Sequence, residues 1–363
     1  MNSLILDPHR NRDSNIELLR IVVIMSTVML HAMHNMPGPG DGISLPEALR
    51  WRALTLPSFS SFGALLIISG YFRLRWKARH FWSLISTIVF WIGATFLAGY
   101  LITGQPVADV KDALHHFLFK GWFISVYLGL FFFAPMINTF IDSIDQRQLG
   151  RYLLIFLGAI FIFGFLSNGS VFAGSGLTVL IFFYMAGAYL RRCEQGARPK
   201  MTAVINQSPW WYLAIYLIIT YIAVPGLAWL THDLGFYTSL YMLANPGNLA
   251  GAIAIFLLFR RLGARSAPQS RAPRSAPHNP VVNWVGASAF SVYIFHCFTP
   301  MDPVLCRVTH DIFATGWNAL WLWPLTLVAI FLFCALVDTF IQRPIFNFIF
   351  NRFHKGSPSA KES

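Results

Sequence analysis

Charged side chains are scarce in this chain, and acidic ones are the scarcest. Only 12% of the 363 residues are charged, with 15 Asp and Glu against 27 Lys and Arg. Hydrophobic residues make up 56% of the chain, and the mean hydropathy is +0.55. These values lie outside the range of soluble globular proteins, so we expect an integral membrane protein.

Cysteine is similarly rare, and its placement argues against a metal or redox motif. No two of the four cysteines have the short spacing of a zinc or redox pair; they are Cys193, Cys297, Cys306 and Cys334. The first fourteen residues are mostly polar, and no small-residue cleavage site follows the next apolar run, so we expect no cleaved signal peptide. The inverted repeats of many secondary transporters have no visible counterpart here.

Long hydrophobic runs make up most of the sequence. A helix needs about 20 apolar residues to cross a bilayer core of about 30 Å. The predicted fold class is therefore all-α, a polytopic membrane bundle of about ten transmembrane helices, with the limits 16–36, 56–72, 81–102, 122–141, 151–167, 175–192, 209–230, 239–260, 284–303 and 318–341.

The distribution of Lys and Arg predicts the orientation of these helices. With the N-terminus inside, 21 of the 27 basic residues lie in cytoplasmic segments and five in outer loops. This bias predicts that both termini are cytoplasmic. The basic excess faces anionic lipid, so no nucleic-acid partner is needed to explain it.

The predicted domain organisation is simple. We expect a cytoplasmic tail at 1–15, one membrane domain at 16–345 with a basic cytoplasmic linker at 263–280, and a cytoplasmic tail at 346–363. The linker is rich in Pro, Ala, Ser and Arg, which favours a flexible connector. A basic flap over a phosphorylated ligand is the alternative.

Two ionisable residues, Arg20 and His31, lie inside the first hydrophobic run. An intramembrane ionisable residue costs several kcal/mol unless it faces a bundle interior or an aqueous cavity, so it marks a candidate functional site. Eleven residues turn an α-helix by about 1100°, which places the two side chains on one stripe, about 16 Å apart. A guanidinium therefore lies near one membrane face and a titratable imidazole lies toward the other.

These two residues suit acyl transfer from a thioester to a hydroxyl. An imidazole can take the hydroxyl proton, and a guanidinium is well matched to the phosphates of a donor such as coenzyme A. A purely structural role for both residues is an equally good interpretation: Arg20 can pair with Glu17, and His31 can form a hydrogen bond with a backbone carbonyl. His31 and His34 at i, i+3 could also share a zinc ion, but no Cys or close carboxylate completes the set, so we predict no metal.

Two later segments add polar and basic groups. Ser69 and Gly70 form a small pair that permits close helix approach, and the basic run with Arg73 and Arg75 follows. The ninth predicted helix carries Tyr293 and His296 on a polar, aromatic stripe. Tryptophans at helix ends, such as Trp122, are usually interfacial anchors, whereas Trp51 in the first outer loop could equally stack on a sugar ring.

Taken together, these motifs resemble acyltransferase family 3, the bacterial multi-pass membrane O-acyltransferases. The resemblance runs from about residue 15 to 345. Its specificity comes from the combination of motifs and not from any one of them. It is carried by Arg20 and His31 in an R-x10-H pattern, Glu17–Arg20, Ile68–Phe72, Trp122–Pro135, which includes Tyr127, and Ser291–His296.

The resemblance implies acetyl-CoA as the usual donor and a surface glycan as acceptor. It implies that His31 and Arg20 are catalytic, and that Arg20, Arg73, Arg75, Ser69 and Tyr71 bind the donor. The expected substrate path contains Glu17, Trp51, Trp122, Tyr127, Tyr293 and His296.

One departure from the family pattern concerns the fourth helix. Many relatives have a Glu after its Trp motif, whereas Trp122 to Phe133 contains no carboxylate. Size and the lack of a fused esterase-like domain resemble the exopolysaccharide acetyltransferases, including those of xanthan-type polymers.

The leading functional hypothesis is an inner-membrane O-acetyltransferase that moves an acetyl group from cytoplasmic acetyl-CoA to a lipid-linked or exported polysaccharide. Its expected partners are that acceptor, membrane lipids and polysaccharide assembly machinery. The alternatives are a transporter or flippase of lipid-linked glycan without covalent chemistry, and a scaffold subunit in which the buried charges only pair helices.

Overall fold

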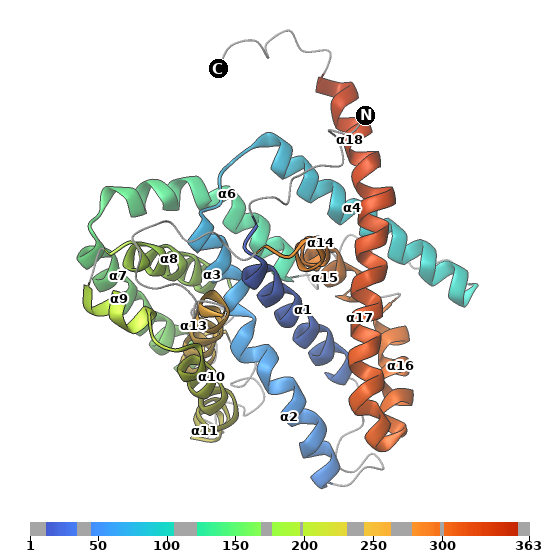
Figure 1. Ribbon diagram of the computed structural model, residues 1–363, viewed down its shortest axis with the longest axis horizontal. Helices are drawn as coiled ribbons and strands as arrows, with labels where there is room; N and C mark the ends of the chain where they lie inside the picture. The colour runs from blue at the N-terminus through green and yellow to red at the C-terminus, as the bar shows by residue number, and fades with distance from the viewer. Residues whose placement is uncertain are drawn as a thin grey trace. The chain divides into compact units, whose positions relative to one another are not determined.

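The computed structural model describes residues 12–34, 45–104, 122–167, 176–196, 199–230, 243–262, 278–297 and 301–354. Regular structure within these ranges is entirely helical (Figure 1). The chain divides into two compact units. The first unit is Met1–Trp76 with Phe117–Asn283, and the second is Lys77–His116 with Trp284–Ser363. The prediction of an all-α polytopic protein is confirmed.

The helices of the first unit include most of the predicted site. They are α1 (Ser14–His34), α2 (Leu45–Ser61), α3 (Gly63–Phe72), α6 (Trp122–Ser143), α7 (Gln146–Ala159), η2 (Ile160–Leu166), α8 (Leu177–Glu194), α9 (Pro199–Ile205), α10 (Pro209–Ile218), η3 (Ile219–Ala223), α11 (Val224–Leu230) and α13 (Pro246–Arg261).

The second unit is built from the remaining helices. They are α4 (Ala78–Thr103), α15 (Ala289–Cys297), α16 (Asp302–Ala314), η6 (Gly316–Asn318), α17 (Ala319–Val337), η7 (Asp338–Gln342) and α18 (Arg343–His354). The short α14 (Pro280–Gly286) contains the boundary between the units.

Seven helices in the described ranges are long and apolar enough to cross a membrane by length and composition. They are Ser14–Ala32, Ala53–Phe72, Ala78–Ile102, Phe123–Ser143, Gln146–Leu166, Pro209–Leu227 and Gly316–Arg352. The total of ten spans and the cytoplasmic position of the termini stay predictions.

Three predicted spans are not among those seven, which were found within the described ranges alone. α8 ends in the charged residues Arg191, Arg192 and Glu194, and the described helix α13 has 16 residues, with 231–242 before it outside the described ranges. The predicted span 284–303 is wrong as a continuous helix, because α14 ends at Gly286 and α15 begins at Ala289. At the other extreme, helix continues from α17 through α18 to His354, so the predicted tail at 346–363 begins inside a helix.

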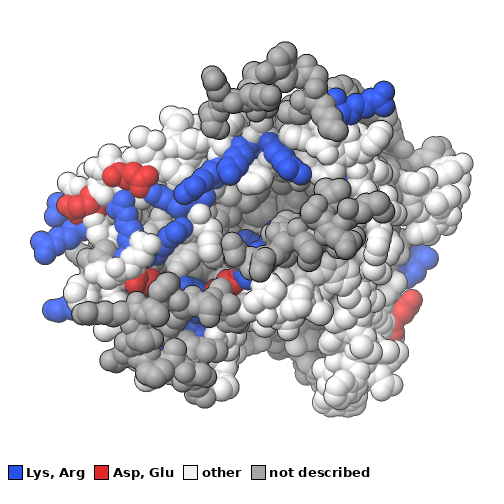
Figure 2. All heavy atoms as spheres, turned by 45° about the horizontal axis from the view of Figure 1, so that its top comes forward, with Lys and Arg blue, Asp and Glu red and all other residues white. Residues whose placement is uncertain are grey.

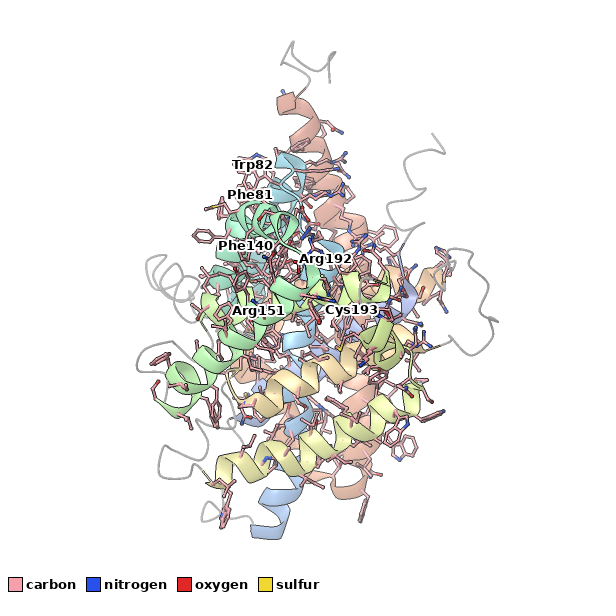
Figure 3. The ribbon with its side chains drawn as sticks, turned by 90° about the vertical axis from the view of Figure 1, so that its left-hand side faces the viewer. Phe81, Trp82, Phe140, Arg151, Arg192 and Cys193 are labelled. Atoms are coloured by element: carbon pink, nitrogen blue, oxygen red, sulfur yellow. The ribbon has the colours of Figure 1, made fainter. Side chains whose placement is uncertain are left out.

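The turn between α6 and α7 shows how local sequence fixes helix ends. The Asp145 carboxylate accepts the backbone N–H groups of Arg147 and Gln148, and the Gln148 side chain accepts the Asp145 N–H, which completes a capping box. At the end of α6, the guanidinium of Arg192, which is labelled in Figure 3, donates to the carbonyl oxygens of Ile141 and Ile144. The two distances are 2.6 and 3.0 Å. These bonds supply donors to carbonyl oxygens at and just beyond the C-terminal end of α6, where the helix provides few N–H groups.

The tightest helix contact in the first unit joins α3 and α8. A Cβ at Gly70 would lie 1.8 Å from the carbonyl oxygen of Tyr184, and one at Gly187 would lie 2.2 Å from that of Ile67. The prediction that the Ser69–Gly70 pair permits close approach is confirmed at Gly70. This contact fixes the end of α3, where the predicted donor-binding residues lie.

Candidate active site

The first predicted pair lies on one uninterrupted helix, α1, as the R-x10-H spacing requires. Near its start, Arg20 donates from Nη1 to Oε1 of Glu17 at 2.5 Å, and Arg12 donates to the same oxygen at 3.3 Å. The Arg20 side chain is 31% exposed. The ion pair with Glu17 that the sequence offered as a structural interpretation is therefore present, and it does not bury the guanidinium completely.

Glu17 is buried in this arrangement, with one oxygen lacking a partner. The residue is 2% exposed, and both arginines bind Oε1. Its Oε2 has no hydrogen-bond partner among the described residues. A buried polar atom without a partner costs free energy, so this oxygen is a candidate acceptor for a ligand N–H or O–H.

His31 lies in the last turn of α1 and is half-buried. The unbroken helix keeps it about 16 Å along the axis from Arg20. His34 belongs to the same turn, but its side chain is outside the described residues, so the zinc alternative is not tested there.

The ends of four segments meet around Arg260 in the first unit. Its guanidinium contacts Asp13 at 2.9 Å, Glu194 at 3.0 Å and the Tyr71 hydroxyl at 3.2 Å, and Tyr71 also donates to Glu194. Arg191 donates to the Tyr71 carbonyl oxygen at 3.0 Å. The start of α1 and the ends of α3, α8 and α13 are thereby tied together at the ends that the charge bias predicts for one membrane face.

Arg73 follows directly on α3 and has an unusual backbone. Among the described residues it is the only non-glycine with a positive φ, 63°, a conformation that is costly for a side chain with a Cβ. Its Nη2 pairs with Asp142, while its buried Nη1 has no partner among the described residues. A strained residue with an unused buried donor is a candidate anion-binding group.

The backbone after Arg73 is held from two other helices. Asn138 donates to the Leu74 carbonyl oxygen at 2.8 Å, and the Leu74 N–H donates to the Tyr184 hydroxyl at 3.0 Å. The Tyr184 hydroxyl in turn donates to Asn138 at 2.9 Å. α6 and α8 therefore fix the position of Arg73 through its neighbour.

Charged groups gather on only part of the face drawn in Figure 2. Basic side chains predominate there, with a few acidic ones among them, and uncharged residues cover much of the rest.

The remaining predicted residues of the first unit are less informative. Ser69 donates to the Leu65 carbonyl oxygen of its own helix at 3.0 Å, and Arg75 is exposed. Tyr127 is half-buried on α6, with its ring 5.8 Å from that of Phe123. The side chains of Trp51 and Trp122, and most of the 263–280 linker, lie outside the described residues.

The second unit contains the late Ser-x-Tyr-x-x-His motif on α15. Ser291 donates to Asp338 at 2.7 Å, and Trp91 donates to the other oxygen of that carboxylate at 2.8 Å. Tyr293 and His296 are both buried, with ring centroids 5.6 Å apart. Asp338 therefore joins α15 to α4.

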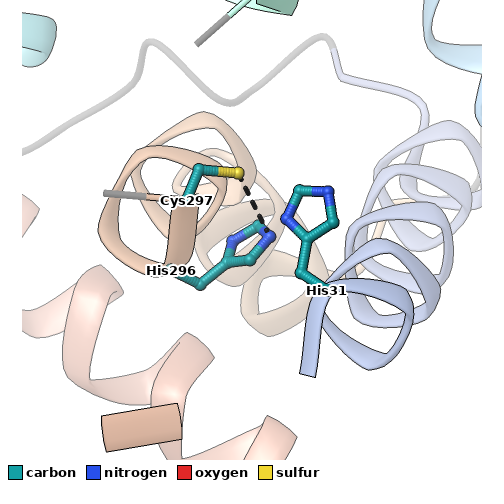
Figure 4. Close-up of side chains that lie close together, drawn as sticks. All are labelled: His31, His296 and Cys297. Carbon is teal, nitrogen blue, oxygen red and sulfur yellow. Dashed lines mark hydrogen bonds between the residues drawn. The ribbon is translucent and has the colours of Figure 1, made fainter. Parts of the chain in front are cut away.

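His296 makes two short contacts within α15. Its Nδ1 lies 2.8 Å from the carbonyl oxygen of Val292, which fixes a proton on that nitrogen. The other nitrogen, Nε2, then accepts from the Cys297 thiol at 3.4 Å (Figure 4). Each ring nitrogen of His296 therefore has a hydrogen-bond partner within α15, and these two contacts fix the orientation of the ring.

Sequence reasoning did not single out the residues that hold this site together. Arg260, Glu194 and Asn138 lie at helix ends, where a polar residue normally faces water, so their partners were not visible from spacing alone. Asp142 and Asp338 likewise lie at or near the predicted inner ends of their helices, and this position is the one signal that the sequence offers for them.

Comparisons with known proteins agree with the motif analysis. The model of acyltransferase family 3, described as an acyltransferase domain, matches residues 13–339. No curated protein and no solved structure gives a match. Since the family model covers most of the chain, from just before α1 to η7, this protein belongs to acyltransferase family 3.

Proposed function

We propose that this membrane acyltransferase transfers an acetyl group from acetyl-CoA to a hydroxyl of a lipid-linked or exported polysaccharide at the bacterial inner membrane. The observation that carries the proposal is Arg73, which follows directly on the Ile68–Phe72 motif with a positive φ and a buried Nη1 that has no hydrogen-bond partner within the described ranges. A guanidinium N–H is matched to a phosphate oxygen.

The proposed reaction needs a general base for the acceptor hydroxyl and cationic side chains that bind the phosphates of the donor. His31 takes the proton of the acceptor hydroxyl while that oxygen attacks the thioester carbonyl carbon. The carbon–sulfur bond then breaks, coenzyme A leaves as the thiolate, and the proton on His31 returns to it. Arg20 and Arg73, with Arg75 nearby in sequence, hold the phosphates, and Tyr71 shapes the path.

The carboxylate missing from the fourth helix has a candidate replacement in this scheme. Glu17, on the same helix as His31, has a buried Oε2 that makes no hydrogen bond in the part of the chain that the structure describes. It lies about 21 Å along α1 from His31, so it would accept an N–H or O–H group at the phosphate-bearing end of the donor and not the hydroxyl that His31 deprotonates. The narrower assignment, a xanthan-type exopolysaccharide acetyltransferase, belongs to the same proposal.

Substitution of Arg73 tests whether this residue binds acetyl-CoA. Arg73→Gln should raise the KM for acetyl-CoA at least tenfold, since a charge-assisted bond to phosphate contributes about 1.5–3 kcal/mol. Arg151→Gln is the matched control, because Arg151 is exposed on α7 (Figure 3). An unchanged KM in a folded Arg73→Gln protein would contradict this role.

An assay on the purified protein also distinguishes an acyltransferase from the alternative, a transporter of lipid-linked glycan. Detergent-solubilised enzyme has no two compartments, so turnover of labelled donor there is expected only from an acyltransferase. Movement of lipid-linked glycan in vesicles without donor consumption would favour the flippase reading.

A further inference from the structure

The second unit contains a cavity of about 370 Å³ between α15, α16 and α17. Its wall is apolar apart from His296 and Thr326, and includes Leu305, Val308 and Phe333. Ligand pockets in proteins span about 300–1,000 Å³, so the volume is large enough for a ligand.

The two polar residues of the wall already use their hydrogen-bonding groups within the protein. Thr326 donates to the Leu322 carbonyl oxygen at 2.8 Å, and His296 contacts Val292 and Cys297. Water is stable in a cavity only where several polar partners meet it, and an apolar cavity of about 150 Å³ stays dry and binds benzene. The wall therefore favours an apolar occupant over water, a sugar or a nucleotide.

The cavity lies beside the interior of a candidate membrane span and opens at the surface of its unit. Its wall includes residues between Thr326 and Phe333, in the interior of the candidate span Gly316–Arg352. The floor is closed by His296, 1% exposed, whereas Val308 and Phe333 at the rim are 38% and 49% exposed. Hydrocarbon chains are the molecules present at such an opening.

α16 adds a polar boundary beside this opening. It presents Val304, Leu305 and Val308 to the cavity, while Arg307 and His310 on the same helix are exposed. A helix with one apolar and one charged face is typical of the membrane interface. A lipid can therefore place its chain in the cavity and keep its headgroup at the charged face of α16.

We infer that this cavity is a binding site for one hydrocarbon chain of a bilayer lipid. A chain inside it restores the dispersion contacts that an empty cavity forfeits. The inference goes beyond acyl transfer and does not rest on it.

Photolabelling of the intact protein tests the site without an activity measurement. The protein is reconstituted in vesicles that contain a phosphatidylcholine with a diazirine on one acyl chain, and labelled peptides are mapped by mass spectrometry. Labelling of the peptides around residues 301–308 and 326–333 is expected, and Ala329→Phe, which fills the cavity, should remove most of it. Val328→Phe is the matched control, because Val328 is 43% exposed and does not line the cavity.

Three results would overturn the inference: no label on these peptides in the wild type, equal label in folded Ala329→Phe and Val328→Phe, or labelling by a diazirine acyl-CoA but not by the lipid. Thermal unfolding checks that the variants are folded. If Ala329→Phe does not fold, Val304→Phe fills the cavity from α16 and gives the same comparison. Acetyl transfer can succeed or fail independently of each outcome.

Discussion

Gly70 is the position where adding a single methyl group tests how the end of α3 is held. A Cβ there would lie 1.8 Å from the carbonyl oxygen of Tyr184 and 2.6 Å from its carbonyl carbon. Ordinary contact begins at 3.4 Å, so Gly70→Ala requires α3 and α8 to separate by about 1.6 Å at this point. The obstructing atoms are backbone, and no change of rotamer can move them away.

Two opposing effects determine how much Gly70→Ala changes the free energy of unfolding. Overpacking costs about 1–3 kcal/mol, toward the upper end here because backbone must move. Alanine recovers up to about 1 kcal/mol over glycine inside a helix. We therefore expect Gly70→Ala to lose about 2 kcal/mol of stability. Gly158→Ala is the matched control, since a Cβ there meets nothing within 4 Å and should leave stability equal or higher.

Thermal unfolding in detergent measures the stability, and the KM for acetyl-CoA measures the geometry of the α3 end. Gly70→Ala should lower the unfolding midpoint and raise the KM, because Tyr71 and Arg73 move with the end of α3. If Gly70→Ala matched Gly158→Ala in both measurements, the close approach of α3 and α8 would be refuted.

Two further predictions concern the contributions of two carboxylates, Asp338 and Asp13, to stability. Ser291→Ala should destabilise the protein by about 1–3 kcal/mol, because it leaves an oxygen of the buried Asp338 without its 2.7 Å donor; an unfolding midpoint equal to the wild type would contradict this. Burial raises the pKa of Asp13 above 3.8, and the nearby Arg260 offsets part of the rise. The stability that Asp13 contributes is therefore fully present below pH 3.8 and is lost as the pH rises through its folded-state pKa. The stability of the wild type relative to Asp13→Asn should fall across that window, and a pH-independent difference would rule the prediction out.

The sequence predicted the features that depend on hydrophobicity and spacing. Long apolar runs are expensive outside a membrane, and an uninterrupted run fixes a helix, so α1 with Arg20 and His31 was predictable. The small residue at Gly70 likewise signalled a close helix contact, although its partner on α8 could not be read from spacing.

The parts that were missed depend on tertiary contacts. Arg260 connects Asp13, Tyr71 and Glu194, which are far apart in sequence and carry no shared motif. The break between α14 and α15 was hidden because Ser288 and its neighbours fit an apolar helix in composition. The positive φ of Arg73 is set by α6 and α8 through Leu74, and no local pattern announces it.

The measurement that tests the central claim most directly is transfer of radiolabelled acetyl from acetyl-CoA to membrane glycolipid or polymer. Vesicles would contain the wild type, His31→Ala or Arg20→Ala at matched protein levels, with the native acceptor supplied. The account predicts label in the acceptor with the wild type and none with either variant. Equal label with all three proteins, or none with the wild type, would contradict it.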